Sequence, residues 1–132
     1  MQRILSIVCL AASTALAQSP AYTLQPLVGA GRQDRSVAAE SVLDGAYGLA
    51  EDSAGNVYIA ESNAGIIRRV SPDGTMERFA GTGTLGNGAS GKPALQTDLT
   101  RPTVLLADKD GGLLFYEAQY CRIRKVQTDG IL

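Results

Sequence analysis

The sequence contains no histidine and no tryptophan, and only 2 of its 132 residues are cysteine. Without imidazole groups the chain cannot form a Ser-His-Asp or Cys-His catalytic arrangement, and it cannot bind a metal ion through histidine. Basic and acidic side chains nearly balance, at 12 against 13, so there is no excess of positive charge to follow a nucleic-acid backbone. These absences exclude several enzyme classes and predict that nucleic acid is not a partner.

The first residues have the pattern of a secretory signal peptide. Arg3 supplies a positive charge, an almost wholly apolar run extends from Ile4 to Ala12, and a small-x-small motif ends at Ala17. We therefore predict a signal peptide over 1–17 that is cleaved after Ala17. The protein is then secreted or periplasmic, with no stable membrane span after cleavage. The alternatives are a membrane anchor that stays uncut and a buried helix.

Cleavage leaves Cys121 as the sole cysteine of the mature chain, which excludes an intrachain disulfide. The fold must then be held by packing, even in an oxidising compartment. Because no histidine or second cysteine is present to activate the thiol, we interpret Cys121 as a half-buried strand residue. An intermolecular disulfide and accidental reactivity are the alternatives.

The mature chain repeats itself at a shift of 56 residues. The stretch 48–61 (GLAEDSAGNVYIAE) aligns with 104–117 (VLLADKDGGLLFYE) without a gap. In the same way 67–74 (IRRVSPDG) aligns with 123–130 (IRKVQTDG). The two segments match in charge, in β-branched positions and in turn residues. Repeats of this period are typical of propellers, solenoids and arrays.

Local composition indicates strands, because the segments between turn signals are short and rich in Val, Ile, Tyr, Phe and Leu. The pattern predicts strands at 48–52, 56–61, 66–71 and 75–80 in the first repeat, and at 104–108, 112–117 and 122–127 in the second. Four antiparallel strands that are apolar on both faces form one propeller blade. We therefore predict an all-β fold made of β-propeller blades of four antiparallel strands, with about two blades present and the ring incomplete.

The first repeat resembles the NHL repeat in Gly55-Asn56-Val57-Tyr58-Ile59-Ala60-Glu61, Ile67-Arg68-Arg69-Val70 and Pro72-Asp73-Gly74. Residues 111–130 resemble a second copy, so the resemblance covers roughly 38–132. It departs from the family where an Asn-His dipeptide is usual, since Ala64-Gly65 and Tyr120-Cys121 occupy those places. A metal-dependent lyase of the family would need histidine ligands, which this chain lacks.

The repeats divide the chain into predicted parts. Blade 1 is expected at 38–83, a Gly-rich inter-blade loop at 84–97, and blade 2 at 98–132, where the outer strand is missing. The mature N-terminus, 18–37, contains the segment 23–31, which resembles 75–83 at a shift of 52. We predict that 23–31 is an outer strand that closes the ring, a role that the NHL resemblance also implies.

Two blades cannot close a ring, because a propeller needs about 4 to 8 of them to bury its sheet faces. We therefore expect this chain to be the N-terminal piece of a longer protein. The alternative is a head-to-tail homo-oligomer, in which 23–31 completes the last blade of the next subunit.

The loop after 75–80 contains two textual matches to nucleotide-binding motifs. Residues 81–86 (GTGTLG) fit the dinucleotide pattern, and 86–92 (GNGASGK) fit most of a phosphate loop. Pro93 follows where a phosphate loop needs Ser or Thr at the start of a helix. We interpret both matches as a Gly-rich connection between blades.

The carboxylates Glu61 and Glu117 share a repeat position, and they suggest either an acid and base pair or Ca²⁺ ligands. Recurrence favours a structural role, because a strand-end carboxylate that satisfies loop amides would recur in every blade. Asp108 and Asp110 resemble the start of a calcium loop but lack its later ligands, so we interpret them as a turn. We expect the strand cations to form inter-blade ion pairs: Arg68, Arg69, Arg122, Arg124 and Lys125.

Two classes of function fit these observations. The first is a non-enzymatic binding or scaffold propeller without a cofactor, whose ring-face loops contact a protein, peptide or glycan. Tyr120 and Arg122 are the candidate contacts, because the first repeat has Ala64 and Ile66 in their places. The alternative is a propeller enzyme, of lyase or lactone hydrolase type, that depends on carboxylates and Ca²⁺. A calcium-dependent rise in melting temperature would distinguish it.

Overall fold

The computed structural model describes residues 36–38 and 41–132, so the predicted signal peptide and the predicted strand at 23–31 lie outside the described residues. The strands are β1 (Ser36–Val37), β2 (Ala46–Glu51), β3 (Val57–Glu61), β4 (Ile66–Val70), β5 (Thr75–Ala80), β6 (Pro102–Ala107), β7 (Leu113–Glu117) and β8 (Arg122–Val126). A short 3-10 helix, η2 (Ala94–Gln96), lies between β5 and β6. The seven predicted strands are confirmed to within two residues at each end, whereas β1 and η2 were not predicted.

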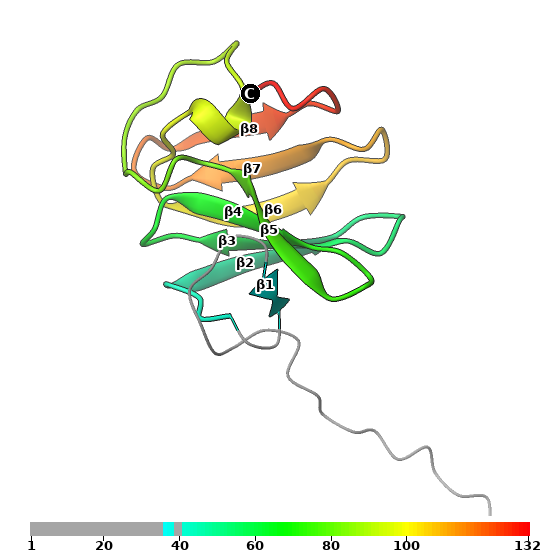
Figure 1. The fold of residues 1–132 in the computed structure, drawn as a ribbon. Coiled ribbons are helices and arrows are strands. Elements are labelled where there is room, and N and C mark those ends of the chain that lie inside the picture. Colours follow the sequence, from blue (N-terminus) through cyan, green and yellow to red (C-terminus); the bar gives the residue numbers. More distant parts are fainter. Residues whose placement is uncertain (1–35, 39–40) are drawn as a thin grey trace, which may run out of the picture.

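The strands form two antiparallel sheets that are stacked on each other (Figure 1). The first sheet has the order β1-β5-β4-β3-β2, and the second has the order β6-β7-β8. We call β2 to β5 blade 1 and β6 to β8 blade 2. The short strand β1 extends blade 1 beyond the expected four strands by pairing with β5. The predicted all-β class, with two successive blades, is confirmed.

The structural repeat follows the sequence repeat residue by residue. In blade 1, Ile59 on β3 pairs with Leu49 on β2 and with Arg68 on β4. Phe115 on β7, at the same repeat position as Ile59, likewise pairs with Leu105 on β6 and with Arg124 on β8. Residues at equivalent positions of the two blades can therefore be compared directly.

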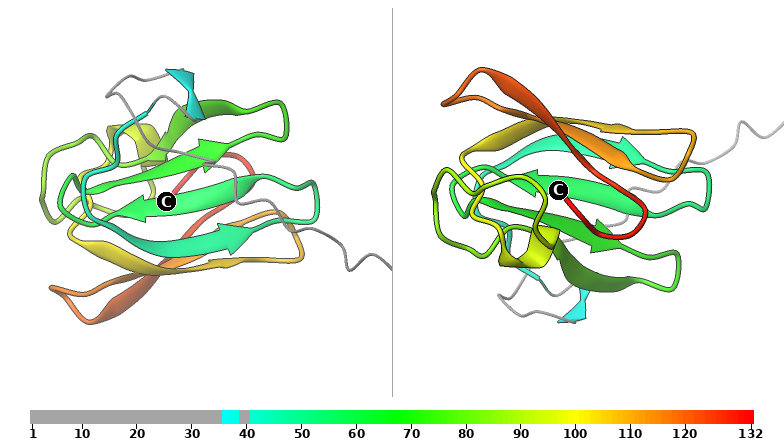
Figure 2. Two further views of the ribbon diagram at one scale, coloured as in Figure 1. Left: turned by 90° about the horizontal axis from the view of Figure 1, so that it is seen from below. Right: turned by 90° about the horizontal axis from the view of Figure 1, so that it is seen from above.

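Each sheet has two faces because alternate strand residues point to opposite sides. The front face of blade 1 carries Tyr58, Ala60 and Ile67, which pack in one core with residues of blade 2. Leu105, Leu113, Phe115 and Val126 supply the blade 2 side of that core, from what we call its back face. The front of blade 1 thus packs on the back of blade 2, as both views in Figure 2 show for the stacked sheets.

Gly48 allows the two inner strands to approach closely. A Cβ atom added there would lie 1.6 Å from the carbonyl oxygen of Thr103 on β6.

On the other side of blade 1, a second cluster forms on the back face from Ala38, Ile59, Val70 and Met76. The residues preceding β2 therefore cover part of that back face.

The Gly-rich segment between β5 and β6 is a connection, as predicted from the sequence, and it covers the outer part of blade 2. The last residues run beside it: the amide of Ala94 donates to the carbonyl of Gly130 at 2.9 Å, and that of Leu132 donates to Lys92 at 3.0 Å. Figure 1 shows η2 next to the C-terminal residues. No helix in the described ranges is long and apolar enough to cross a membrane.

Candidate functional site

Each blade buries a glutamate at the end of its second strand. Glu61 ends β3 and Glu117 ends β7, and both residues are fully buried. The amide of Asp44 donates to Oε2 of Glu61 at 3.0 Å, and the amide of Thr100 donates to Oε1 of Glu117 at 2.9 Å. Positions 44 and 100 are themselves 56 residues apart. The prediction that these carboxylates satisfy loop amides is confirmed, and the contact belongs to the blade architecture.

In the part of blade 1 that the structure describes, a single arginine provides the charge that Glu61 needs. Nε of Arg68 on β4 donates to Oε1 of Glu61, and both side chains are almost completely buried. A carboxylate buried with one cation and one amide donor is balanced in charge and largely satisfied in hydrogen bonding. Blade 1 therefore shows what the repeat requires.

The strand cations pair within their own blade, so the prediction of inter-blade ion pairs was wrong. The pairs are Arg68–Glu61, Arg69–Glu77, Arg122–Glu117, Arg124–Glu117 and Lys125–Asp108. Antiparallel pairing places the side chains of neighbouring strands about 5 Å apart, closer than side chains that must cross to another sheet. The nearest carboxylate is therefore on an adjoining strand or turn.

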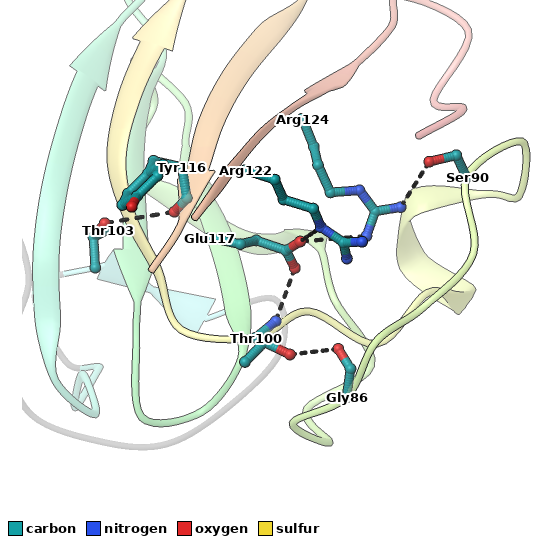
Figure 3. A network of polar contacts seen from close by, with 8 residues as sticks. All are labelled: Gly86, Ser90, Thr100, Thr103, Tyr116, Glu117, Arg122 and Arg124. Atoms are coloured by element: carbon teal, nitrogen blue, oxygen red, sulfur yellow. Dashed lines mark hydrogen bonds and ion pairs between the residues drawn. The ribbon is translucent and has the colours of Figure 1, made fainter. Parts of the chain in front are cut away.

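Blade 2 places two arginines on one carboxylate (Figure 3). Nε of Arg122 donates to Oε2 of Glu117 at 2.5 Å, while Nη1 of Arg124 lies 3.6 Å from the same oxygen. Arg124 is the repeat equivalent of Arg68, so Arg122 has taken the close contact that Arg68 makes in blade 1. Nη2 of Arg122 and Nη1 of Arg124 are buried and have no hydrogen-bond partner among the described residues.

The arginine pair is therefore under-neutralised. Burial lowers the pKa of Arg124, Glu117 opposes that effect, and the nearby charge of Arg122 adds to it, so the pKa lies below its ordinary value. Nη2 of Arg124 donates to Oγ of Ser90 in the Gly-rich segment, at 3.3 Å. A neutral hydroxyl cannot balance the second positive charge. An additional anion at this position would be electrostatically favourable.

The structure brings the two predicted contact residues together. Tyr120 lies in the turn between β7 and β8, and its ring centroid is 5.2 Å from Cζ of Arg122, which is a cation–π contact. Tyr120 is 43% exposed, and the side chain of Arg122 is 34% exposed. We call Glu117, Tyr120, Arg122 and Arg124 the cationic corner. Sequence reasoning found Tyr120 and Arg122 but not the role of Arg124, which the repeat equivalence to Arg68 could have indicated.

Cys121 is exposed and lies in the turn before β8, so its interpretation as a half-buried strand residue was wrong. Its φ of 47° is in the left-handed region, like the φ of 63° at the equivalent Gly65. Arg101, with φ of 44°, similarly stands where blade 1 has Gly45. The repeat imposes this backbone conformation whatever the side chain, and the alignment of Cys121 with a glycine was the overlooked signal.

Asp108 and Asp110 lie at the turn between β6 and β7, and Asp108 makes contacts that stabilise this turn. The amide of Gly111 donates to the carbonyl of Asp108 at 2.9 Å, and Nζ of Lys125 donates to Oδ2 of Asp108 at 2.5 Å. The interpretation of this segment as a turn is confirmed. Within 36–38 and 41–132, no group of three or more His, Cys, Asp or Glu side chains is placed to hold a metal ion.

No protein-family model and no curated protein matches the sequence. Among solved structures, a protein of unknown function from Bacteroides thetaiotaomicron matches with a TM-score of 0.61 and 25% identity, over 76% of this chain and 24% of that chain. An auxiliary nutrient binding protein from the same species matches with a TM-score of 0.56 and 20% identity, over 75% and 27% of the two chains. Virginiamycin B lyase from Staphylococcus aureus matches with a TM-score of 0.47 and 21% identity, over 65% and 25%.

The similar structures are β-propeller-like, and the chain has the blades of a β-propeller. It spans about a quarter of the length of these structures. The similarity therefore establishes the architecture of two blades, and the function must be argued from the residues of this chain.

Proposed function

We propose that this chain is the binding module of an exported NHL-repeat propeller, and that its cationic corner binds a carboxylate group of a peptide or glycan without catalysing a reaction. The observation that carries the proposal is the second arginine of blade 2. Among the described residues, blade 1 neutralises the same buried glutamate with Arg68 alone, so a blade can hold this carboxylate without an arginine at the position of Arg122. The signal-peptide pattern and the NHL-like residues support export and the repeat family.

The corner offers two different contacts to a ligand. The partly exposed guanidinium of Arg122 can donate a charge-assisted hydrogen bond to a carboxylate, and the buried charge of Arg124 lies nearby. The exposed ring of Tyr120 supplies a flat apolar surface beside that charge. Such a ring can stack on the apolar face of a sugar or on a peptide side chain. The two residues together fit an acidic peptide or an acidic sugar.

The geometry of the carboxylates supports binding rather than catalysis. Glu61 and Glu117 are both fully buried, and each is held by an arginine and a backbone amide. A general acid or base must reach the proton that it transfers on the substrate, directly or through one water molecule. Carboxylates that are enclosed and ion-paired in this way serve the fold.

The proposal is tested by isothermal titration of the purified chain with four probes. Hexaglutamate and tetragalacturonate carry carboxylates on a peptide and on a sugar, whereas hexaglutamine and cellotetraose are their neutral counterparts. We expect one acidic probe to bind and its neutral counterpart not to bind, with affinity that falls as salt is added. The acidic probe that binds identifies the source of the carboxylate. Absence of binding by both acidic probes would refute the proposal.

Variants then locate the binding site. Arg122→Ile introduces the residue of blade 1, and it should reduce affinity at least tenfold, since a charge-assisted hydrogen bond is lost. Arg122→Lys keeps the charge but not the planar guanidinium, and it should retain part of the affinity. Arg101→Asn is the control, because it removes an exposed arginine outside the corner and asparagine tolerates the positive φ at that position. An equal loss in the Arg101 variant would show that binding reflects net charge alone.

A further inference from the structure

The front face of blade 2 is apolar and exposed, although its counterpart in blade 1 is buried. Ile123 is 71% exposed, whereas the equivalent Ile67 is 0% exposed in the interface between the blades. Val104 and Leu106 on β6 are also largely exposed on this face. Together with Leu114 and Tyr116 they line a shallow groove.

The back face of blade 1 has the complementary property. Leu49 is 68% exposed, whereas the equivalent Leu105 of blade 2 is 7% exposed because it packs against blade 1. Tyr47 is exposed beside Leu49, and both border a second groove that reaches Val57 and Leu43. Each end of the two-blade stack thus exposes the apolar surface that is buried at the centre.

We propose that these two ends bind each other in separate copies of the chain, so that the front of blade 2 in one copy packs on the back of blade 1 in the next. The chain itself contains the template, since the front of blade 1 packs on the back of blade 2. A second copy presents the matching back face on its own blade 1. This inference is independent of the proposed carboxylate site.

The contact joins two different surfaces, so it is heterologous and leaves one front and one back face open in every dimer. Further copies can add until the ring closes. Val104 stands where blade 1 has Gly48, whose missing side chain allows the backbones to meet. The copies must therefore be spaced more widely than the blades of one chain, and they meet through side chains.

Two surface variants test the proposal by sedimentation velocity and light scattering. Leu49→Asp blocks the back of blade 1, and Ile123→Asp blocks the front of blade 2; Ser53→Asp, in the exposed β2–β3 turn, is the control. The unmodified chain and the control should assemble beyond the monomer as concentration rises. Each blocked variant should be monomeric on its own, with a β-type far-UV circular dichroism spectrum.

An equimolar mixture of the two blocked variants is the decisive sample. Each variant retains one open face, so the mixture should form a dimer and nothing larger. An unmodified chain that stays monomeric at all concentrations would overturn the proposal. A dimer of either blocked variant alone, or a mixture that stays monomeric, would also overturn it, because neither result fits front-on-back contact. If Ile123→Asp fails to fold, Leu106→Lys tests the same face.

Discussion

The two blades share a buried glutamate but differ in how they neutralise it. Among the residues that the structure describes, Glu61 pairs with one arginine, Arg68, and Glu117 pairs with two, Arg122 and Arg124. The amide donors from the preceding loop are the same in both blades. The shared parts are what a blade needs in order to fold, and the added arginine is what blade 2 has beyond that need. Comparison of repeats therefore separates structural residues from candidate functional ones.

Loss of the glutamate charge should have the largest effect, and it should be larger in blade 2. Glu61→Gln leaves one buried arginine without its carboxylate, whereas Glu117→Gln leaves the buried Arg124 and the partly exposed Arg122. Breaking a buried pair costs about 3–5 kcal/mol, and we expect Glu61→Gln near the lower end and Glu117→Gln near the upper end. Denaturant unfolding followed by circular dichroism measures both. Equal losses would contradict the claim that Glu117 holds two cations.

An exchange of residues at the inner strands should distinguish the buried front face from the exposed one. Gly48→Val places atoms where Thr103 already lies, so it should destabilise the protein by about 3 kcal/mol or more. Val104→Gly, at the equivalent exposed position, should cost only about 0.5–1 kcal/mol through chain entropy. Thermal unfolding provides the comparison. A tolerated Gly48→Val variant would show that the blades are not packed as described.

The turn before the third strand offers a smaller contrast. Gly65→Ala puts a Cβ atom 2.8 Å from the carbonyl oxygen of Leu99 at positive φ, and it should destabilise by about 1–2 kcal/mol. Cys121→Gly relieves left-handed strain at the equivalent position but makes the unfolded chain more flexible. These effects oppose each other, so the free energy of unfolding should change by no more than about 0.5 kcal/mol. Cys121→Ala serves as the control for the thiol. Similar losses at positions 65 and 121 would mean that the turns are not equivalent.

The smallest effect concerns pH and salt at the hairpin turns. Burial raises the pKa of Asp52, but hydrogen bonds from Asn56, Tyr58 and Ala54 outweigh it, so the pKa lies below its ordinary value of 3.8. In blade 2 the bond from Lys125 lowers the pKa of Asp108 below the same value. A carboxyl group whose pKa is lower in the folded than in the unfolded state stabilises the fold. This contribution is complete above the unfolded-state pKa of about 3.8, and it is lost as the pH falls through the folded-state pKa.

Salt distinguishes the two turns. Because Lys125 is charged whereas the donors to Asp52 are not, 0.5 M NaCl should raise the pKa of Asp108 towards its ordinary value and leave that of Asp52 nearly unchanged. Carboxyl NMR titration at low and high salt measures each group. An equal response of both carboxyls would contradict the assigned partners.

The sequence predicted the strands well because the repeat locates the turns twice. Asp and Gly recur in equivalent turns, with β-branched residues between them. This pattern leaves few other ways to place the strand ends. The strand β1 could not be predicted, since two residues that pair with β5 have no pattern of their own. Burial was also beyond sequence reasoning: Ile67 and Ile123 are the same residue at the same repeat position, but only one of them is covered by another sheet.

The candidate site was predicted in part. Tyr120 and Arg122 were found because they interrupt the repeat, but their stacking and the short contact to Glu117 depend on the turn geometry. The partners of the strand cations were assigned to the wrong sheet, because sequence patterns give the charge of a side chain and not the distance to its neighbours. Cys121 was misplaced for the same reason, since its left-handed turn position is visible only through its alignment with Gly65.

One double variant tests the central claim, which is that the added residues of blade 2 serve binding and not folding. Tyr120→Ala with Arg122→Ile converts the corner to the residues of blade 1 and leaves Glu117 with Arg124. Its unfolding free energy and its affinity for the acidic probe are measured on the same sample. We predict a change in stability of less than about 1 kcal/mol, because a partly exposed ion pair contributes little, together with loss of binding. A loss of several kcal/mol in stability with unchanged affinity would contradict the account.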